Sequence, residues 1–250
     1  MADATVKCDS SGNLDDGFTG SYGADSNIAA VRDASTGNIS NQTSATSSII
    51  GHGTAFGGNM YIYRPFANFD LSGNDSSGSS LSGNTVESAQ IKFTTEANLT
   101  GFSNVTSQGE TIYLCKTDGF GSSMSTADYN ALDGWASSGS YNGEVTVYGT
   151  ATDAASSEIT FNLSSEAITD INSAISAGQD WTVMFLCQDD FLYNTGTGGL
   201  GSPVTTGGFA RFDGVRMKTT EVSGSDCNFL HLTYGSASPL ENSILFGTNF

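Results

Sequence analysis

Residues 59–71 read NMYIYRPFANFDL, and this stretch decides the fold class. Tyr61 and Tyr63 fall on one side of the chain and Ile62 on the other, which is the two-residue period of a β-strand. Pro65 cannot donate a hydrogen bond to a neighbouring strand, so it predicts an edge position or a bulge. The stretch is therefore expected to be a strand of an antiparallel sheet.

Strand patterns recur along the chain between loops rich in Gly, Ser, Thr and Asn. In residues 86–95, Ala89, Ile91 and Phe93 face one way and polar residues face the other. Residues 181–187 (WTVMFLC) are apolar throughout, which is typical of a strand buried on both faces. Further strands are expected at residues 5–8, 28–32, 111–116, 144–148, 158–163, 209–218 and 229–234.

Two segments carry helical patterns instead. Residues 164–177 place isoleucines at the i, i+3, i+7 spacing of one helix face, and Gly178 follows as a stop signal. Residues 124–133 predict a second, weaker helix, in which Ser125 and Asp128 have the spacing of a capping box. Residues 35–48 are polar and are expected to form a loop.

The order of these segments predicts an all-β protein, namely a jelly-roll-type antiparallel β-sandwich with one or two short helices. No repeat of solenoid or propeller period and no linker between two cores is visible. The simplest division is one domain over residues 1–234 and a C-terminal docking arm over residues 235–250. The arm is expected to dock on a neighbouring subunit or to pack on its own domain, through the apolar residues Ile244, Leu245, Phe246 and Phe250.

The charge of the chain excludes two classes of partner. It has 8 Lys and Arg against 26 Asp and Glu, a formal net charge of −18. Nucleic-acid binding needs a basic surface that displaces counterions from phosphates, and an anionic membrane surface would repel an acidic protein. Neither nucleic acid nor a membrane is therefore an expected partner.

Cysteine and acidic residues bear on metals and redox state. No two cysteines form a C-x-x-C pair and the chain has only two histidines, so a zinc site is not expected. The four cysteines are Cys8, Cys115, Cys187 and Cys227. Buried free thiols are expected at Cys115 and Cys187, and disulfides are the alternative if the protein matures outside a cell. No cofactor is expected apart from a structural calcium ion, for which the candidate acidic sites are Asp9, Asn13, Asp15 and Asp16, and Asp189 with Asp190.

Several short motifs follow one another in a recognisable order. They are Arg64, Phe66, FDLS at 69–72, SAQI at 88–91, Trp135, a strand and helix over 159–175, and LHLTY at 230–234. This order resembles the DNRLRE or disaggregatase-related jelly-roll domains, which are similar to carbohydrate-binding modules. The resemblance implies a two-sheet antiparallel sandwich of a kind found in polysaccharide-acting enzymes, surface adhesins and bacteriophage virion proteins. This sequence departs from the pattern in its longer loop at 72–85 and in its C-terminal arm.

Catalytic patterns are weak in this sequence. There is no G-x-S-x-G nucleophile motif. His231 lies in a strand and is expected to face solvent or to be satisfied in the core, and His52 is expected to be a loop residue without a recognisable partner. Asp189 and Asp190 are adjacent, so their side chains should diverge rather than act as an acid–base pair. The protein is therefore expected not to be an enzyme.

Aromatic residues near loops are the candidates for ligand binding. A sugar presents an apolar C–H face and a rim of hydroxyls, so it binds beside exposed aromatic rings with polar neighbours. The candidates are Trp135, Tyr141, Phe191 and Tyr193. The alternative is that these residues anchor the core and the loops.

These observations favour a structural role on a bacteriophage virion surface, as a capsid decoration or fibre-type protein. The first residues lack the basic and apolar regions of a secretory signal, so we expect synthesis in the host cytoplasm and release by lysis. The partners would be other virion proteins or further copies of the chain, with a homotrimer as one arrangement. The alternative is an extracellular carbohydrate-binding module or adhesin that recognises a cell-surface polysaccharide.

Overall fold

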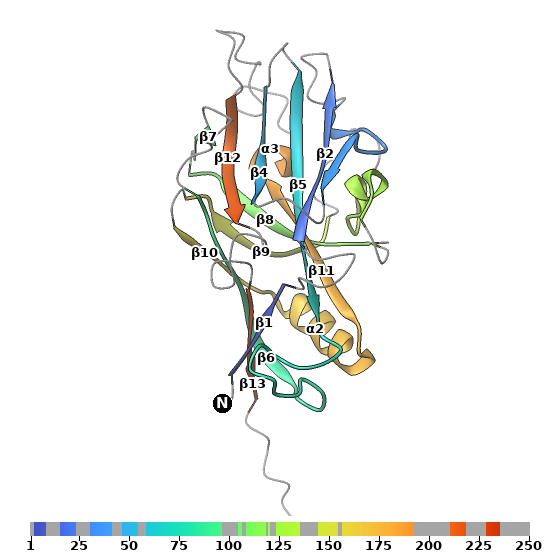
Figure 1. Ribbon diagram of the computed structural model, residues 1–250, viewed down its shortest axis with the longest axis vertical. Helices are drawn as coiled ribbons and strands as arrows, with labels where there is room; N and C mark the ends of the chain where they lie inside the picture. Colours follow the sequence, from blue (N-terminus) through green and yellow to red (C-terminus); the bar gives the residue numbers. More distant parts are fainter. Residues whose placement is uncertain are drawn as a thin grey trace, which may run out of the picture.

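The computed structural model describes residues 3–8, 16–23, 31–41, 47–54, 59–96, 105–106, 109–118, 120, 124–135, 145–154, 157–192, 211–218 and 229–235. Within them, the strands form two sheets that pack together in a sandwich-like arrangement, as the sequence predicts. Figure 1 shows the larger sheet in the upper part of the molecule and the smaller sheet with a helix in the lower part. The chain is thus all-β with short helices.

The smaller sheet is antiparallel throughout. Its order is β1 (Asp3–Lys7), β13 (Phe229–Tyr234), β6 (Val86–Thr94) and β10 (Glu158–Asn162). The alternation predicted for β6 is confirmed, because Ala89, Ile91 and Phe93 are all buried. The edge of β1 is covered by the loop after β5, where Ser76 N donates to Thr5 O and Lys7 N donates to Ser76 Oγ. Such cover protects an edge strand from pairing with another chain.

Within the described residues, the larger sheet has nine strands, and β7 and β12 form its one parallel pair. Its main order is β7 (Val105–Thr106), β12 (Arg211–Lys218), β4 (Ser47–Thr54), β5 (Met60–Asp70), β11 (Asp180–Cys187), β8 (Thr111–Lys116) and β9 (Val147–Thr152). Off this path, β2 (Asp16–Gly23) pairs with β5, and β3 (Ile39–Asn41) pairs with β2. The expectation that β11 is buried on both faces is confirmed.

The edge position predicted from Pro65 is wrong. β5 pairs with β2 along one side, and the ladder passes Pro65 opposite Phe18 without a register shift. Along its other side β5 pairs with β4 as far as Tyr63 and with β11 from Phe66 onward. The proline therefore lies where the strand changes partner, so its missing N–H falls at a gap between two ladders.

The main core lies between the sheets and under the long helix. Rings of Phe93, Phe161 and Phe185 pack with centroids 5.5–5.9 Å apart. Helix α2 (Ser165–Ala177) buries Ile171 and Ile175 and lies against β6 and β11. Burial of apolar side chains such as these supplies the main favourable free energy of folding.

Helix boundaries follow local capping chemistry. Ser164 accepts a hydrogen bond from Ala167 N at the start of α2, and Gly178 ends it with φ of 62°. A side chain there would be strained in this left-handed conformation, which explains the glycine. The helix predicted at 124–133 is a shorter 3₁₀ turn, η1 (Thr126–Asn130), although its predicted capping box between Ser125 and Asp128 is present.

Other boundaries differ from the sequence prediction. Residues 31–32 are helical, whereas a strand was expected at 28–32, and β3 lies in the expected loop at 35–48. β9 begins at Val147, three residues after the expected start. A further short helix, α3 (Gln188–Leu192), directly follows β11. Among the described helices, none is both long and apolar enough to cross a membrane.

Candidate functional site

Among the places in the described structure where polar side chains meet, two have the largest groups of charged and aromatic residues. The first is inside the molecule, and we call it the buried polar cluster: Arg32, Arg64, Asp190, Asp189, His52, Cys187, Tyr129 and Trp135. The second is a groove at the surface beside α2, which we call the α2 groove. The two differ in burial and therefore in what they can do.

Arg64 and Asp190 form the centre of the buried polar cluster. Arg64 Nε donates to Asp190 Oδ2 at 2.7 Å, and Nη2 donates to Oδ1 at 2.8 Å. Arg64 Nη1 also donates to Tyr129 O at 2.7 Å and to Asn130 Oδ1 at 2.6 Å. Both charged residues are fully buried. Such a two-bond geometry satisfies a charge pair that would be costly to bury alone.

The electrostatics of Arg64 follow from this geometry. Burial by itself lowers the pKa of Arg64, but the carboxylate of Asp190 and the hydrogen bonds to it raise the pKa overall. The guanidinium therefore keeps its charge inside the protein. It links β5, which carries it, to the start of α3 and to η1.

Arg32 and Trp135 extend the cluster. Arg32 Nε donates to Asp190 O at 2.7 Å, and Nη1 donates to Asp33 Oδ1 at 2.8 Å. The guanidinium carbons of Arg32 and Arg64 lie 4.4 and 4.3 Å from the centre of the Trp135 ring. Cations over an indole face are attracted by its electron-rich surface. Trp135, proposed from the sequence as a glycan-binding residue, is half-buried and contacts both arginines here.

Cys187, His52 and Asp189 stand in the order of a nucleophile, a base and a carboxylate. Cys187 Sγ lies 4.0 Å from His52 Nδ1, and His52 Nε2 lies 3.4 Å from Asp189 Oδ2. The expectation that His52 is a loop residue without a partner is wrong, because it is buried in β4. The period of 47–54 (SSIIGHGT) is obscured by two glycines, so the strand was missed.

The thiol of Cys187 is poorly placed for chemistry. Its exposed fraction is 3%. Burial, and then the charge of Asp190, raise the pKa of Cys187 well above its ordinary value. A cysteine nucleophile needs a thiolate or a base within hydrogen-bond reach, and access for a substrate. The buried, protonated thiol of Cys187 lacks that access in this structure.

Asp189 and Asp190 diverge as their adjacency predicts. Asp189 faces His52, and Asp190 faces Arg64. No group of three or more His, Cys, Asp or Glu side chains comes close enough to hold a metal within the described ranges. The other calcium candidates, Asp9, Asn13 and Asp15, lie outside the described residues, as does the side chain of Asp16.

The remaining residues singled out from the sequence fall into two groups. Phe191 is buried and stacks on Tyr113, with ring centres 3.8 Å apart. Tyr141, Tyr193 and the arm residues Ile244, Leu245, Phe246 and Phe250 lie outside the described residues. Ligand binding by all of these residues stays a prediction.

Two of the cysteines in the described segments are buried free thiols, as expected: Cys115 and Cys187. Cys8 is buried as well, and Cys227 lies outside the described residues. Cys8 Sγ donates to Asn68 O at 3.0 Å. Burial raises the pKa of Cys115, so this thiol also stays protonated at neutral pH.

The α2 groove lies where the second half of α2 meets the ends of β8 and β11. Its volume is about 420 Å³, and its walls include Lys116, Phe120, Tyr148, Asp170, Gln179 and Trp181. Lys116 Nζ lies 2.9 Å from Asp170 Oδ2, and the Tyr148 hydroxyl donates to the same carboxylate oxygen. No local pattern in the sequence predicts this groove, because its walls come from segments far apart in the chain.

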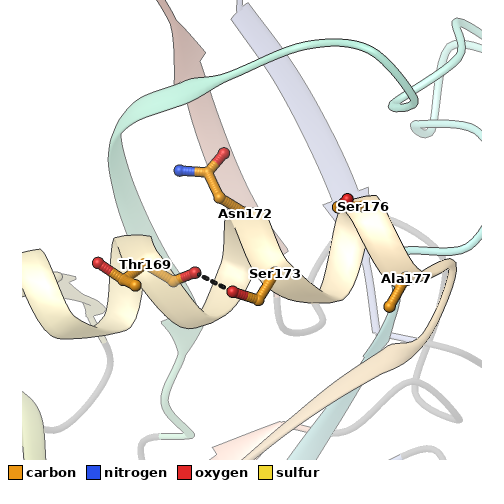
Figure 2. A pocket seen from close by; sticks show the side chains of 5 residues that line it. All are labelled: Thr169, Asn172, Ser173, Ser176 and Ala177. Atoms are coloured by element: carbon orange, nitrogen blue, oxygen red, sulfur yellow. Dashed lines mark hydrogen bonds between the residues drawn. The ribbon is translucent and has the colours of Figure 1, made fainter.

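A second, more open hollow continues along α2 (Figure 2). Figure 2 shows Thr169, Asn172, Ser173, Ser176 and Ala177 along one side of the helix, with Ser173 bonded to the carbonyl of Thr169. Ser173 and Ala177 also line the α2 groove, so the two hollows adjoin. Together they form a polar surface rich in hydroxyl groups.

Comparison with known proteins adds no relative. No protein-family model matches the chain, and no curated protein matches it.

Proposed function

We propose that this protein is a non-enzymatic surface protein of a bacteriophage virion, of the capsid decoration or fibre type. It would act by protein–protein packing with other virion proteins or with copies of itself. The observation that carries the proposal is the buried polar cluster. Its charged groups contact one another in a buried layer formed by β5, η1 and α3, so they fix the scaffold and leave no open centre of reactive groups among these described residues.

A rigid acidic sandwich suits this role. The Arg64–Asp190 pair joins β5 to α3, and Arg64 also holds η1 through Tyr129 O. Loops carried on such a scaffold keep a fixed presentation, which shape-complementary packing requires. The covered edge of β1 and the net charge of −18 both oppose uncontrolled association. Assembly would then depend on dedicated contacts.

The C-terminal arm is the proposed contact. An apolar cluster at the end of a polar segment can dock into a groove or against a sheet edge of a neighbour. A homotrimer joined by such arms is the self-assembled form that we propose, and the virion surface is the proposed location.

Sedimentation of the full chain tests this role. We expect an oligomer of defined mass for the unchanged protein and a monomer for the double variant Leu245→Asp/Phe246→Asp, because two charges in an apolar contact oppose burial. The matched control is Ser236→Asp/Ser238→Asp, which adds the same charge to the arm outside the apolar cluster and should leave the mass unchanged. A mass that is the same in all three proteins would contradict arm-driven assembly.

Binding to a cell-surface glycan is the second candidate function. The α2 groove favours it, because this groove combines charged groups, an amide and the partly exposed ring of Phe120 at the surface.

A further inference from the structure

We propose that the α2 groove is a binding site for a neutral sugar chain. This inference deepens the second candidate function by naming a site and a ligand class, and it is independent of virion assembly. It assigns the site to residues of β8, β11 and α2, and not to the loop aromatics that the sequence suggested.

The groove has the size of a small-molecule site. Its volume of about 420 Å³ falls within the range of roughly 300–1,000 Å³ that is usual for ligand pockets. It lies open to solvent along α2 and continues into the hydroxyl-rich hollow of Figure 2. An elongated ligand such as a sugar chain can therefore extend from one hollow into the next.

Its polar groups suit sugar hydroxyls. The side chains of Lys116 and Asp170 are 32% and 29% exposed, so each can exchange a water contact for a ligand contact. Gln179 is exposed at the end of α2 and offers both a donor and an acceptor. A carboxylate, an ammonium group and an amide along one groove can bond to neighbouring hydroxyls of a sugar ring.

Its aromatic groups suit the apolar face of a sugar. Trp181 and Tyr148 pack with ring centres 5.5 Å apart and are almost fully buried, so they support the base of the groove. Phe120 lines the groove and is partly exposed, and its ring centre lies 5.7 Å from that of Phe66. A partly exposed ring beside hydrogen-bonding groups is the combination that sugar recognition needs.

The charges in and around the groove select a neutral ligand. Lys116 is the one cation of the described groove lining, and Asp170 and Asp180 both line the same groove. The hydrogen bond to Asp170 raises the pKa of Lys116, and Asp133 and Glu166 add to the effect, so the ammonium charge is already balanced by acidic neighbours. With −18 on the whole chain, acidic sugars would be repelled.

The test is an NMR titration of the full chain with neutral hexasaccharides of glucose, galactose and mannose at millimolar concentration. We expect at least one of them to shift backbone amide signals at 116–120, 148 and 170–182. Lys116→Ala and Gln179→Ala should each weaken binding, the first about tenfold because it removes a charged hydrogen-bond donor.

The matched control is Lys92→Ala. Lys92 has a side chain that is 31% exposed, and it forms an ion pair with Glu158 at 3.5 Å on the smaller sheet. It therefore matches Lys116 in exposure and in having an acidic partner, but it lies outside the groove. This variant should bind as the unchanged protein does. The proposal is overturned if none of the hexasaccharides shifts these signals, if the shifts lie elsewhere, or if Lys116→Ala binds as tightly as Lys92→Ala. Tighter binding of polygalacturonate at the groove would overturn the neutral ligand class.

Discussion

The ion pair inside the buried polar cluster and the ion pair in the α2 groove have similar lengths and opposite surroundings. Arg64 and Asp190 approach to 2.7 Å with no exposed side-chain surface, while Lys116 and Asp170 approach to 2.9 Å with about a third of each side chain exposed. A buried charge must be paired completely, because removing it from water costs several kcal/mol. A half-exposed pair keeps water as an alternative partner, so a ligand can replace that water. Burial therefore separates a structural pair from one that is available for binding.

Removal of Arg64 is expected to have the largest effect. Arg64→Met should lower the free energy of unfolding by about 3–5 kcal/mol, because the buried Asp190 carboxylate loses both hydrogen bonds to Arg64 and keeps only the longer contact with Arg32 Nε at 3.6 Å. Urea unfolding followed by circular dichroism measures the loss. The control is Arg216→Met, which breaks a partly exposed pair with Glu96 at 3.3 Å and should cost no more than about 1 kcal/mol. Equal losses of unfolding free energy in Arg64→Met and Arg216→Met would contradict the distinction between a buried and a partly exposed ion pair.

Loss of the Tyr148 hydroxyl is expected to come next. Tyr148→Phe should cost about 1.5 kcal/mol, because the hydroxyl donates to the charged Asp170. Burial raises the pKa of Tyr148, and the bond to Asp170 raises it further, so the phenol stays protonated throughout the test. The control is Tyr234→Phe, whose hydroxyl is buried without a hydrogen-bond partner in the described structure and should cost nothing. A larger loss of unfolding free energy for Tyr234→Phe than for Tyr148→Phe, measured by urea unfolding, would contradict the stabilising role of the Tyr148 hydroxyl.

Loss of Lys116 should matter less for stability. Lys116→Ala should cost about 0.2–1 kcal/mol at low salt, as exposed ion pairs do. In 1 M NaCl the screening length is about 3 Å, so the cost should shrink toward zero, whereas the cost of Arg64→Met should persist. Unfolding curves at both salt concentrations measure this. A salt-independent cost at Lys116 would show that packing, and not charge, is lost.

The smallest expected effect concerns His231 and pH. Burial, and then Lys92, lower its pKa below 6.5 in the folded protein. His231 therefore binds a proton more readily in the unfolded chain than in the folded protein. The stability that the neutral His231 contributes to the folded protein is complete above pH 6.5 and is lost as the pH falls through its folded pKa. His231→Gln should flatten that part of the stability curve, as thermal unfolding at successive pH values would show. An unchanged slope would assign the pH dependence to other groups.

Local chemistry made part of the fold predictable. The alternation in β6, the apolar run of β11 and the caps of α2 all depend on residues within a few positions of one another. Such patterns fix the type of an element. They fix its ends less well, as the late start of β9 and the shortened η1 show.

The partners of polar residues were not predictable in this way. Arg64 and Asp190 are 126 positions apart, and His52 and Cys187 are 135 positions apart. Nothing in the sequence around His52 indicates a partner, because sheet topology brings these residues together. The α2 groove was missed for the same reason, since Lys116, Asp170 and Trp181 come from three separate elements.

A double-mutant cycle between Arg64 and Asp190 tests the central distinction most directly. The unfolding free energies of Arg64→Met, Asp190→Leu and the double variant give the coupling between the two side chains. We predict a coupling of about 2–3 kcal/mol, with the double variant more stable than Arg64→Met alone, because both buried charges are then removed. A coupling below about 0.5 kcal/mol, which is usual for an exposed pair, would contradict the structural role of the buried polar cluster.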